Sequence, residues 1–141
     1  MLRLWVGANG LARTSLCVYP GSECILLEEM RAFDHVGVPT AEKQPGEMYV
    51  EATKVWVTDP EQHPHRVEFL RFEPDSPVKG PVRDLPHIAF RVECLEEEIE
   101  GAEILLGPFH ATQTLRVVFV KKDGAVIEFM ENSAPGHWFR R

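Results

Sequence analysis

Residues 84–132 read DLPHIAFRVECLEEEIEGAEILLGPFHATQTLRVVFVKKDGAVIEFMEN. Short runs rich in β-branched and aromatic residues, in which apolar side chains recur at every second place, predict strands here, because successive side chains on a strand point to opposite faces. We expect these strands at 86–92, 104–106, 115–122 and 125–131.

Two local signals complete this stretch. Leu95 and Ile99 lie four residues apart in LEEEIEG, which gives a short helix one apolar face, and Gly101 is well placed to end it. Residues 122–124, Lys-Asp-Gly, predict a tight hairpin turn between the last two strands. The stretch therefore reads as a strand, a helix and three further strands.

The preceding part of the chain has a similar strand pattern without the helix. Strands are expected at 31–38, 53–58 and 66–73. Between the first and last of these, the segment 39–65 contains four prolines and a glycine that interrupt any helical periodicity. A helix after the first strand is therefore missing or reduced to a turn. Two halves, about 31–75 and 84–132, form a weak internal repeat, and each ends in a strand that carries a glutamate.

Four strings, FDHVGV, HRVEFLRFE, PHIAF and VIEFME, each carry one histidine or glutamate on the strand face opposite apolar neighbours. These residues are His35, Glu68, His87 and Glu128. Two imidazoles and two carboxylates suit a divalent ion such as Zn, Ni, Co, Fe or Mn. Alternation puts His35 on the same face as Phe33 and Gly37.

Glu131 is a rival for Glu128. Its place in the alternation groups it with Ile127 and Phe129, on the other face of the strand. We therefore expect Glu128 to be the ligand.

From about Arg31 to Asn132 the chain resembles the vicinal oxygen chelate superfamily, which includes glyoxalase I, methylmalonyl-CoA epimerase, extradiol dioxygenases and fosfomycin-resistance enzymes. In glyoxalase I the metal is bound by a histidine on the first strand, a glutamate ending the first module, a histidine opening the second module and a glutamate on the final strand. His35, Glu68, His87 and Glu128 stand in that order. Dioxygenases and fosfomycin enzymes typically present two histidines and one glutamate, so the complete set favours the isomerase and epimerase branch.

The resemblance implies an α+β fold in which paired βαβββ modules form a curved mixed sheet around a metal cavity. It also implies a glyoxalase-like, metal-dependent lyase or isomerase/epimerase that acts on a small oxygenated carbonyl compound, its thiol adduct or an acyl thioester, by proton abstraction and enediolate stabilisation. By the same resemblance, Glu128 and Glu68 are the candidates for the base. The alternative is a non-catalytic small-molecule-binding protein of the same fold, serving resistance or sequestration, as bleomycin-binding proteins do.

Two further residues are candidates for contact with a substrate. Arg91 is on the same strand face as His87 and could hold an anionic group, or it could form an ion pair with a neighbouring glutamate. His110, in GPFHATQT, lies in the loop where relatives contact substrate.

The 141 residues suit one domain, with two flanking segments. LRLWV, SLCVY and ECILLEE predict a β-hairpin extension at 1–29, although Met30 could equally be the start of an ancestral domain. The domain itself is expected over 30–132, followed by a C-terminal tail at 133–141. Paired modules of this superfamily commonly associate, so the resemblance also implies a homodimer.

Composition limits the partners. The net charge is −7, and no cluster of Lys and Arg offers a face to a phosphate backbone, so nucleic acid is not an expected partner. No apolar run approaches the ~20 residues of a membrane span. Cys17, Cys24 and Cys94 are an odd set without CxxC spacing, which favours reduced thiols and a cytoplasmic location.

Overall fold

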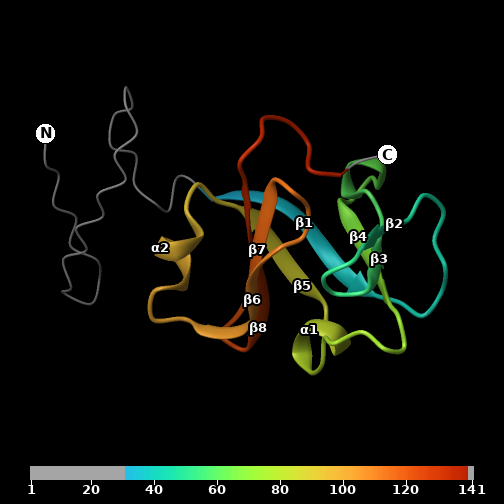
Figure 1. Ribbon diagram of the computed structural model, residues 1–141, viewed down its shortest axis with the longest axis horizontal. Helices are drawn as coiled ribbons and strands as arrows, with labels where there is room; N and C mark the ends of the chain where they lie inside the picture. Colours follow the sequence, from blue (N-terminus) through green and yellow to red (C-terminus); the bar gives the residue numbers. More distant parts are fainter. Residues whose placement is uncertain (1–30, 140–141) are drawn as a thin grey trace, which may run out of the picture.

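The computed structural model describes residues 31–139, so the predicted hairpin at 1–29 lies outside the described residues. Eight strands form a single mixed sheet that curls into a half-barrel (Figure 1). The strands are β1 Ala32–Pro39, β2 Met48–Val50, β3 Val55–Val57, β4 Val67–Phe72, β5 His87–Arg91, β6 Glu103–His110, β7 Leu115–Lys122 and β8 Ala125–Asn132. Three short helices join them, namely η2 Pro60–Gln62, α1 Pro81–Asp84 and α2 Leu95–Ile99.

The strand order is β2-β3-β4-β1-β5-β8-β7-β6. Both halves follow one scheme: the first strand pairs in parallel with the last, β1 with β4 and β5 with β8. The two first strands, β1 and β5, pair antiparallel and join the halves. As a result, the four strands expected to carry the metal ligands, β4, β1, β5 and β8, are consecutive at the centre of the sheet.

Most predicted elements are found within a residue or two of their expected bounds. The predicted helix occupies Leu95–Ile99, and among the described residues the segment 40–47 between β1 and β2 contains no helix, as expected. The largest differences in length are in β3, which is shorter than predicted, and β6, which extends to His110. The sequence did not predict β2, whose three residues are too few to show alternation and are held by pairing with β3.

The two faces of the sheet carry separate apolar clusters. On β7, Val117 and Phe119 belong to the larger cluster, which lines the inside of the curl. Val118 and Val120, the alternate residues, pack with Leu95 of α2 on the outside. Alternate residues of one strand therefore line the inner cavity on one face and pack against helix α2 on the other.

A β-bulge in β1 changes the expected alternation. Pairing with β5 shifts register between Phe33 and His35, so that one extra residue, Asp34, is accommodated there. Asp34 and His35 are both buried, whereas Phe33 is 44% exposed. The prediction that Phe33 and His35 lie on the same face was therefore wrong, because simple alternation does not survive a bulge.

The C-terminal segment packs against the domain. Trp138 and Phe139 are buried and belong to the inner apolar cluster. Figure 1 shows this segment running from β8 across to the side of the molecule that carries β2, β3 and β4. The part of the predicted tail that the structure describes thus covers one side of the inner cluster. No helix within residues 31–139 is long and apolar enough to cross a membrane.

Candidate metal centre

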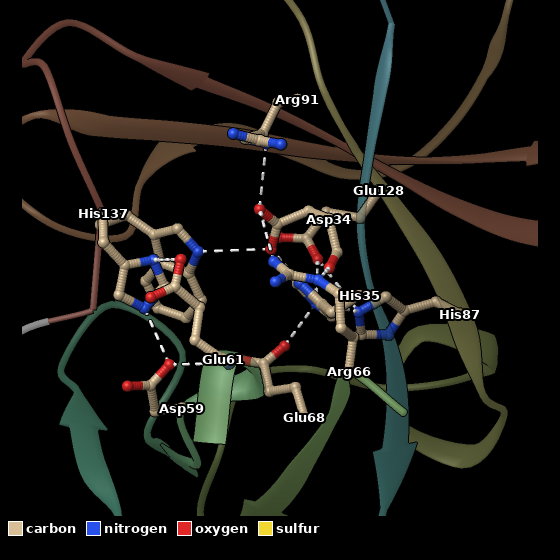
Figure 2. A network of polar contacts seen from close by, with 11 residues as sticks. Asp34, His35, Asp59, Glu61, Arg66, Glu68, His87, Arg91, Glu128 and His137 are labelled. Atoms are coloured by element: carbon tan, nitrogen blue, oxygen red, sulfur yellow. Dashed lines mark hydrogen bonds and ion pairs between the residues drawn. The ribbon is translucent and has the colours of Figure 1, made fainter. Parts of the chain in front are cut away.

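His35, Glu68, His87 and Glu128 come together in one buried group that could hold a metal ion. One ligand-type atom from each lies within 4.8 Å of the others. The Nε2 atom of His35 lies 2.6 Å from Glu68 Oε2 and 3.4 Å from Glu128 Oε2, and the Nε2 atom of His87 lies 3.0 Å from the same Glu128 oxygen. Figure 2 shows these side chains converging from four strands.

Asp34 supports His35 from behind. The Nδ1 atom of His35 donates a hydrogen bond to Asp34 Oδ1 at 2.8 Å, which leaves Nε2 directed at the two glutamates. This carboxylate–histidine pair is the arrangement that fixes the tautomer and orientation of metal-binding histidines. The side chain of Asp34 also meets the guanidinium groups of Arg66 and Arg91 and the indole nitrogen of Trp138.

The charges in the group are strongly coupled. Burial by itself lowers the pKa of the His35 imidazole, but the charge of Glu68 and the hydrogen bond to Asp34 outweigh it and raise that pKa well above 6.5. Burial raises the pKa of Glu128, but hydrogen bonds from His35 and His87 outweigh it and lower that pKa to about 2. The Glu128 carboxylate is thus held as an anion beside a positively charged His35 imidazole.

His87 approaches the group through a gap in β1. Its register partner on that strand is Gly37, and a Cβ atom at residue 37 would overlap three atoms of the imidazole ring. The ring packs edge-on against Phe119, with centroids 5.1 Å apart. Within residues 31–139 no group hydrogen-bonds the buried Nδ1 atom of His87, so packing holds that side of the ring while Glu128 contacts Nε2 on the other.

The donor set fits a divalent cation. The two Nε2 atoms face each other at 3.4 Å, and both also face carboxylate oxygen. The His35 ring has a carboxylate at each nitrogen, Asp34 at Nδ1 and Glu68 at Nε2, so it needs a positive charge, either from a second proton or from a metal at Nε2. Nitrogen from imidazole and oxygen from carboxylate are ligands for borderline divalent ions, and the two carboxylates balance the charge of the dication.

The group lies at the polar end of a cavity of about 50 Å³. His35, Glu68 and Glu128 contribute to its wall, and most of the remaining wall is apolar. Trp138 of the C-terminal segment is part of that wall, and its ring centroid lies 6.3 Å from that of His35. A small molecule in this space would contact the candidate ligands at one end and hydrocarbon elsewhere.

The two predicted substrate-contacting residues lie apart from the cavity wall. Arg91 has a side chain that is 58% exposed, and its Nε atom forms an ion pair with Asp34 at 3.3 Å. The ion pair that we considered for Arg91 is therefore with an aspartate rather than a glutamate. His110 ends β6 and is exposed, while Phe109 and Ala111 on either side of it line the cavity.

Glu131, the rival for Glu128, has a structural role. One of its oxygens accepts the backbone N–H of Leu95 at the start of α2, and the other pairs with Arg116. Its side chain therefore serves the outer face of the sheet, as the alternation predicted.

A second cluster, formed by Asp59, Glu61 and His137, anchors the C-terminal segment. His137 contacts Asp59 through Nε2 at 2.8 Å and Glu61 through Nδ1 at 3.4 Å. One ligand-type atom from each of these three residues lies within 4.8 Å of the others, so this group too could hold an ion. The cluster holds Trp138 in place over the cavity.

Sequence reasoning missed three contributors to the centre, namely Asp34, Gly37 and Trp138. The signal for Asp34 was a charged residue next to a candidate ligand, at a strand position where alternation calls for an apolar side chain. Gly37 could have been noticed as a glycine inside a strand, which often marks a close approach. Trp138 carried no local signal.

Comparisons with known proteins bear on the fold alone. No family model and no curated protein matches the chain. A solved structure described as a hypothetical protein, BH1468 from Bacillus halodurans C-125, is similar to it with a TM-score of 0.56 and 20% sequence identity, over 76% of this chain and 98% of that one. This likeness supports the curled mixed sheet as the fold of the chain.

Proposed function

We propose that this protein binds a divalent metal ion through His35, Glu68, His87 and Glu128 and acts as a glyoxalase-like lyase or isomerase/epimerase on a small oxygenated carbonyl compound. The observation that carries the proposal is the convergence of two imidazoles and two carboxylates, all buried, at the polar end of an otherwise apolar cavity. Gathering four ionisable side chains away from water is costly, so a functional ion is the simplest reason for it.

The paired-module interpretation of the fold supports this proposal. The second half runs β5-α2-β6-β7-β8, and the first half repeats the strands with the same pairing order. In glyoxalase I, which the sequence resembles, each module supplies one histidine from its first strand and one glutamate from its last. Here β1 and β4 carry His35 and Glu68, while β5 and β8 carry His87 and Glu128.

The chemistry follows from where the carboxylates lie. A bound cation would polarise a substrate carbonyl and make the neighbouring C–H more acidic. A carboxylate oxygen of Glu68 or Glu128 can then accept the proton while the C–H electron pair moves towards the carbonyl. Return of the proton to the neighbouring carbon gives isomerisation, and return to the opposite face gives epimerisation.

The strand order favours two bases rather than one. Glu68 comes from β4 and Glu128 from β8, on opposite sides of the central β1–β5 pair. A substrate bound at the ion would have one carboxylate from each half of the sheet nearby. This arrangement supports a reaction in which one glutamate removes the proton and the other returns one.

The experiment is proton exchange followed by NMR in deuterated water. Protein loaded with Ni, Zn, Co or Mn is offered small α-hydroxycarbonyl compounds, methylglyoxal–thiol adducts and acyl thioesters. We expect metal-dependent exchange that falls about 10²–10⁴-fold, or more, in Glu128→Gln and in Glu68→Gln. The conservative change Glu131→Gln, on the same strand as Glu128 but on the outer face, is the matched control. Equal exchange in all four proteins would contradict the assignment.

The alternative is a metal-binding or metal-free protein that holds a small molecule without converting it. The predominantly apolar wall of the cavity favours this alternative, because hydrocarbon walls bind but do not react. Tight ligand binding with no exchange under any of the metals would support it.

A further inference from the structure

We propose that the substrate group held beside the metal centre is short, uncharged and apolar, and that the substrate is a free small carbonyl compound rather than an adduct with a charged thiol carrier. The proposal rests on the proposed function and narrows its substrate class. It follows from the wall of the cavity, its size and the charge of the chain.

The wall offers little to a charged or strongly polar group. Among the lining residues that the structure describes, the polar side chains besides the candidate ligands are Thr53 and the indole of Trp138, and the apolar members come from both halves of the sheet. Neither lysine nor arginine is among the lining residues that the structure describes. An anionic group that entered would lose its hydration without gaining a partner, which is a heavy penalty.

The basic side chains nearest the centre are already engaged. Arg66 and Arg91 both pair with the carboxylate of Asp34, behind His35. Neither contributes to the cavity wall. These two arginines therefore neutralise Asp34, which orients the candidate ligand His35, and do not face a substrate in the cavity.

The space itself is small. The cavity volume of about 50 Å³ is a few times the roughly 10–15 Å³ that a cavity needs to hold one water molecule. It is closed on one side by Trp138, which is only 7% exposed. A substituent of a few carbon atoms suits this space, whereas a peptide or nucleotide carrier does not.

The net charge of the chain also disfavours an anionic substrate. The chain carries a net charge of −7, which repels the carboxylates or phosphates of common thiol carriers. A neutral carbonyl compound meets no such barrier.

The test compares two chelating ligands of equal length. Protein loaded with Co²⁺ is titrated with propionohydroxamate, which ends in a methyl group, and with malonomonohydroxamate, which ends in a carboxylate, and the visible absorption of the cobalt reports binding. We expect the neutral ligand to bind about 10- to 100-fold more tightly. The measurement does not depend on turnover.

A pair of variants on β6 checks that the cavity wall sets this preference. Leu106 is half-buried, lines the cavity and pairs with Phe119 of the inner cluster, so Leu106→Lys adds a cation at the wall. Ile104, two residues away, is 45% exposed, pairs with Val120 of the outer cluster and serves as the matched control. Leu106→Lys should reduce or reverse the preference for the neutral ligand, and Ile104→Lys should leave it unchanged.

The outcomes separate the two proposals. Cobalt binding with equal or tighter binding of the charged ligand to the unsubstituted protein would overturn the substrate class and leave the proposed metal centre standing. Failure of the unsubstituted protein to bind cobalt would overturn the proposed function and this inference with it. Should Leu106→Lys fail to fold, the comparison of the two ligands on the unsubstituted protein still decides.

Discussion

Gly37 of β1 and His87 of β5 are register partners, and the imidazole of His87 occupies the space that a Cβ atom at position 37 would need. The glycine therefore sets the depth at which the histidine enters the centre. We predict that Gly37→Ala displaces the ring, lowers metal affinity about 10- to 100-fold and destabilises the fold by roughly 1–3 kcal/mol. Metal titration and urea unfolding measure the two effects.

Val38→Ala is the control for this change. Val38 is the next residue on β1, and alternation points its side chain to the opposite face. It should lower stability without altering metal affinity. Unchanged affinity in Gly37→Ala would mean that the position of His87 does not depend on this gap.

Asp34 is predicted to strengthen metal binding without touching the metal. Asp34→Asn keeps the shape but removes the charge that His35 Nδ1–H faces at 2.8 Å. Metal affinity should fall about 10- to 100-fold, because the partners behind ligating histidines tune the basicity and orientation of the ring. The same change at exposed Asp84 should have no effect. An Asp34→Asn protein that binds metal as tightly as the original would remove Asp34 from the centre.

Trp138 should report metal binding by fluorescence. Its ring lies close to that of His35, with 6.3 Å between centroids, so an open-shell ion such as Co²⁺ or Ni²⁺ at the centre should quench it, and Zn²⁺ should not. We expect this quenching to be lost in Trp138→Phe and retained in Trp56→Phe. Trp56 lies on β3, where its indole N–H donates a hydrogen bond to Glu73. The opposite result would place the ion elsewhere.

The ion pair between Glu47 and Arg71 should make stability depend on pH. Two hydrogen bonds, at 2.9 and 2.7 Å, join the carboxylate to the guanidinium and lower the pKa of Glu47 below 4.5. A lowered pKa gives stability that is present above pH 4.5 and is lost as pH falls through the lower, folded-state value. Urea unfolding should show Glu47→Gln less stable by about 1 kcal/mol at pH 7, with a smaller difference at pH 3.

Exposed Glu42, in the same loop, provides the control for this pair. Glu42→Gln should leave stability nearly unchanged at both pH values. A constant gap between the Glu47→Gln protein and the original at pH 7 and pH 3 would show that the effect is not electrostatic.

The sequence predicted the four candidate ligands because each lies on a strand with clear alternation, and because the order of the strands matched a known scheme. What it could not predict depends on irregularity or on distance along the chain. The bulge at Asp34 inverts the alternation for one residue, and Trp138 reaches Asp34 from 104 residues away. Such contacts arise from the packed fold and leave no local pattern. The homodimer stays a prediction, which light scattering can test.

Metal binding by the unsubstituted protein and by His87→Ala tests the central claim most directly. His87 is one of the two imidazoles in the group, and its removal leaves a cavity rather than a broken strand pairing. Elemental analysis and titration with Zn²⁺, Ni²⁺ or Co²⁺ should find one tightly bound ion per chain, and a large loss of affinity in the folded His87→Ala protein. Equal metal content in the two proteins, or none in the original, would contradict the claim that these four residues form a metal centre.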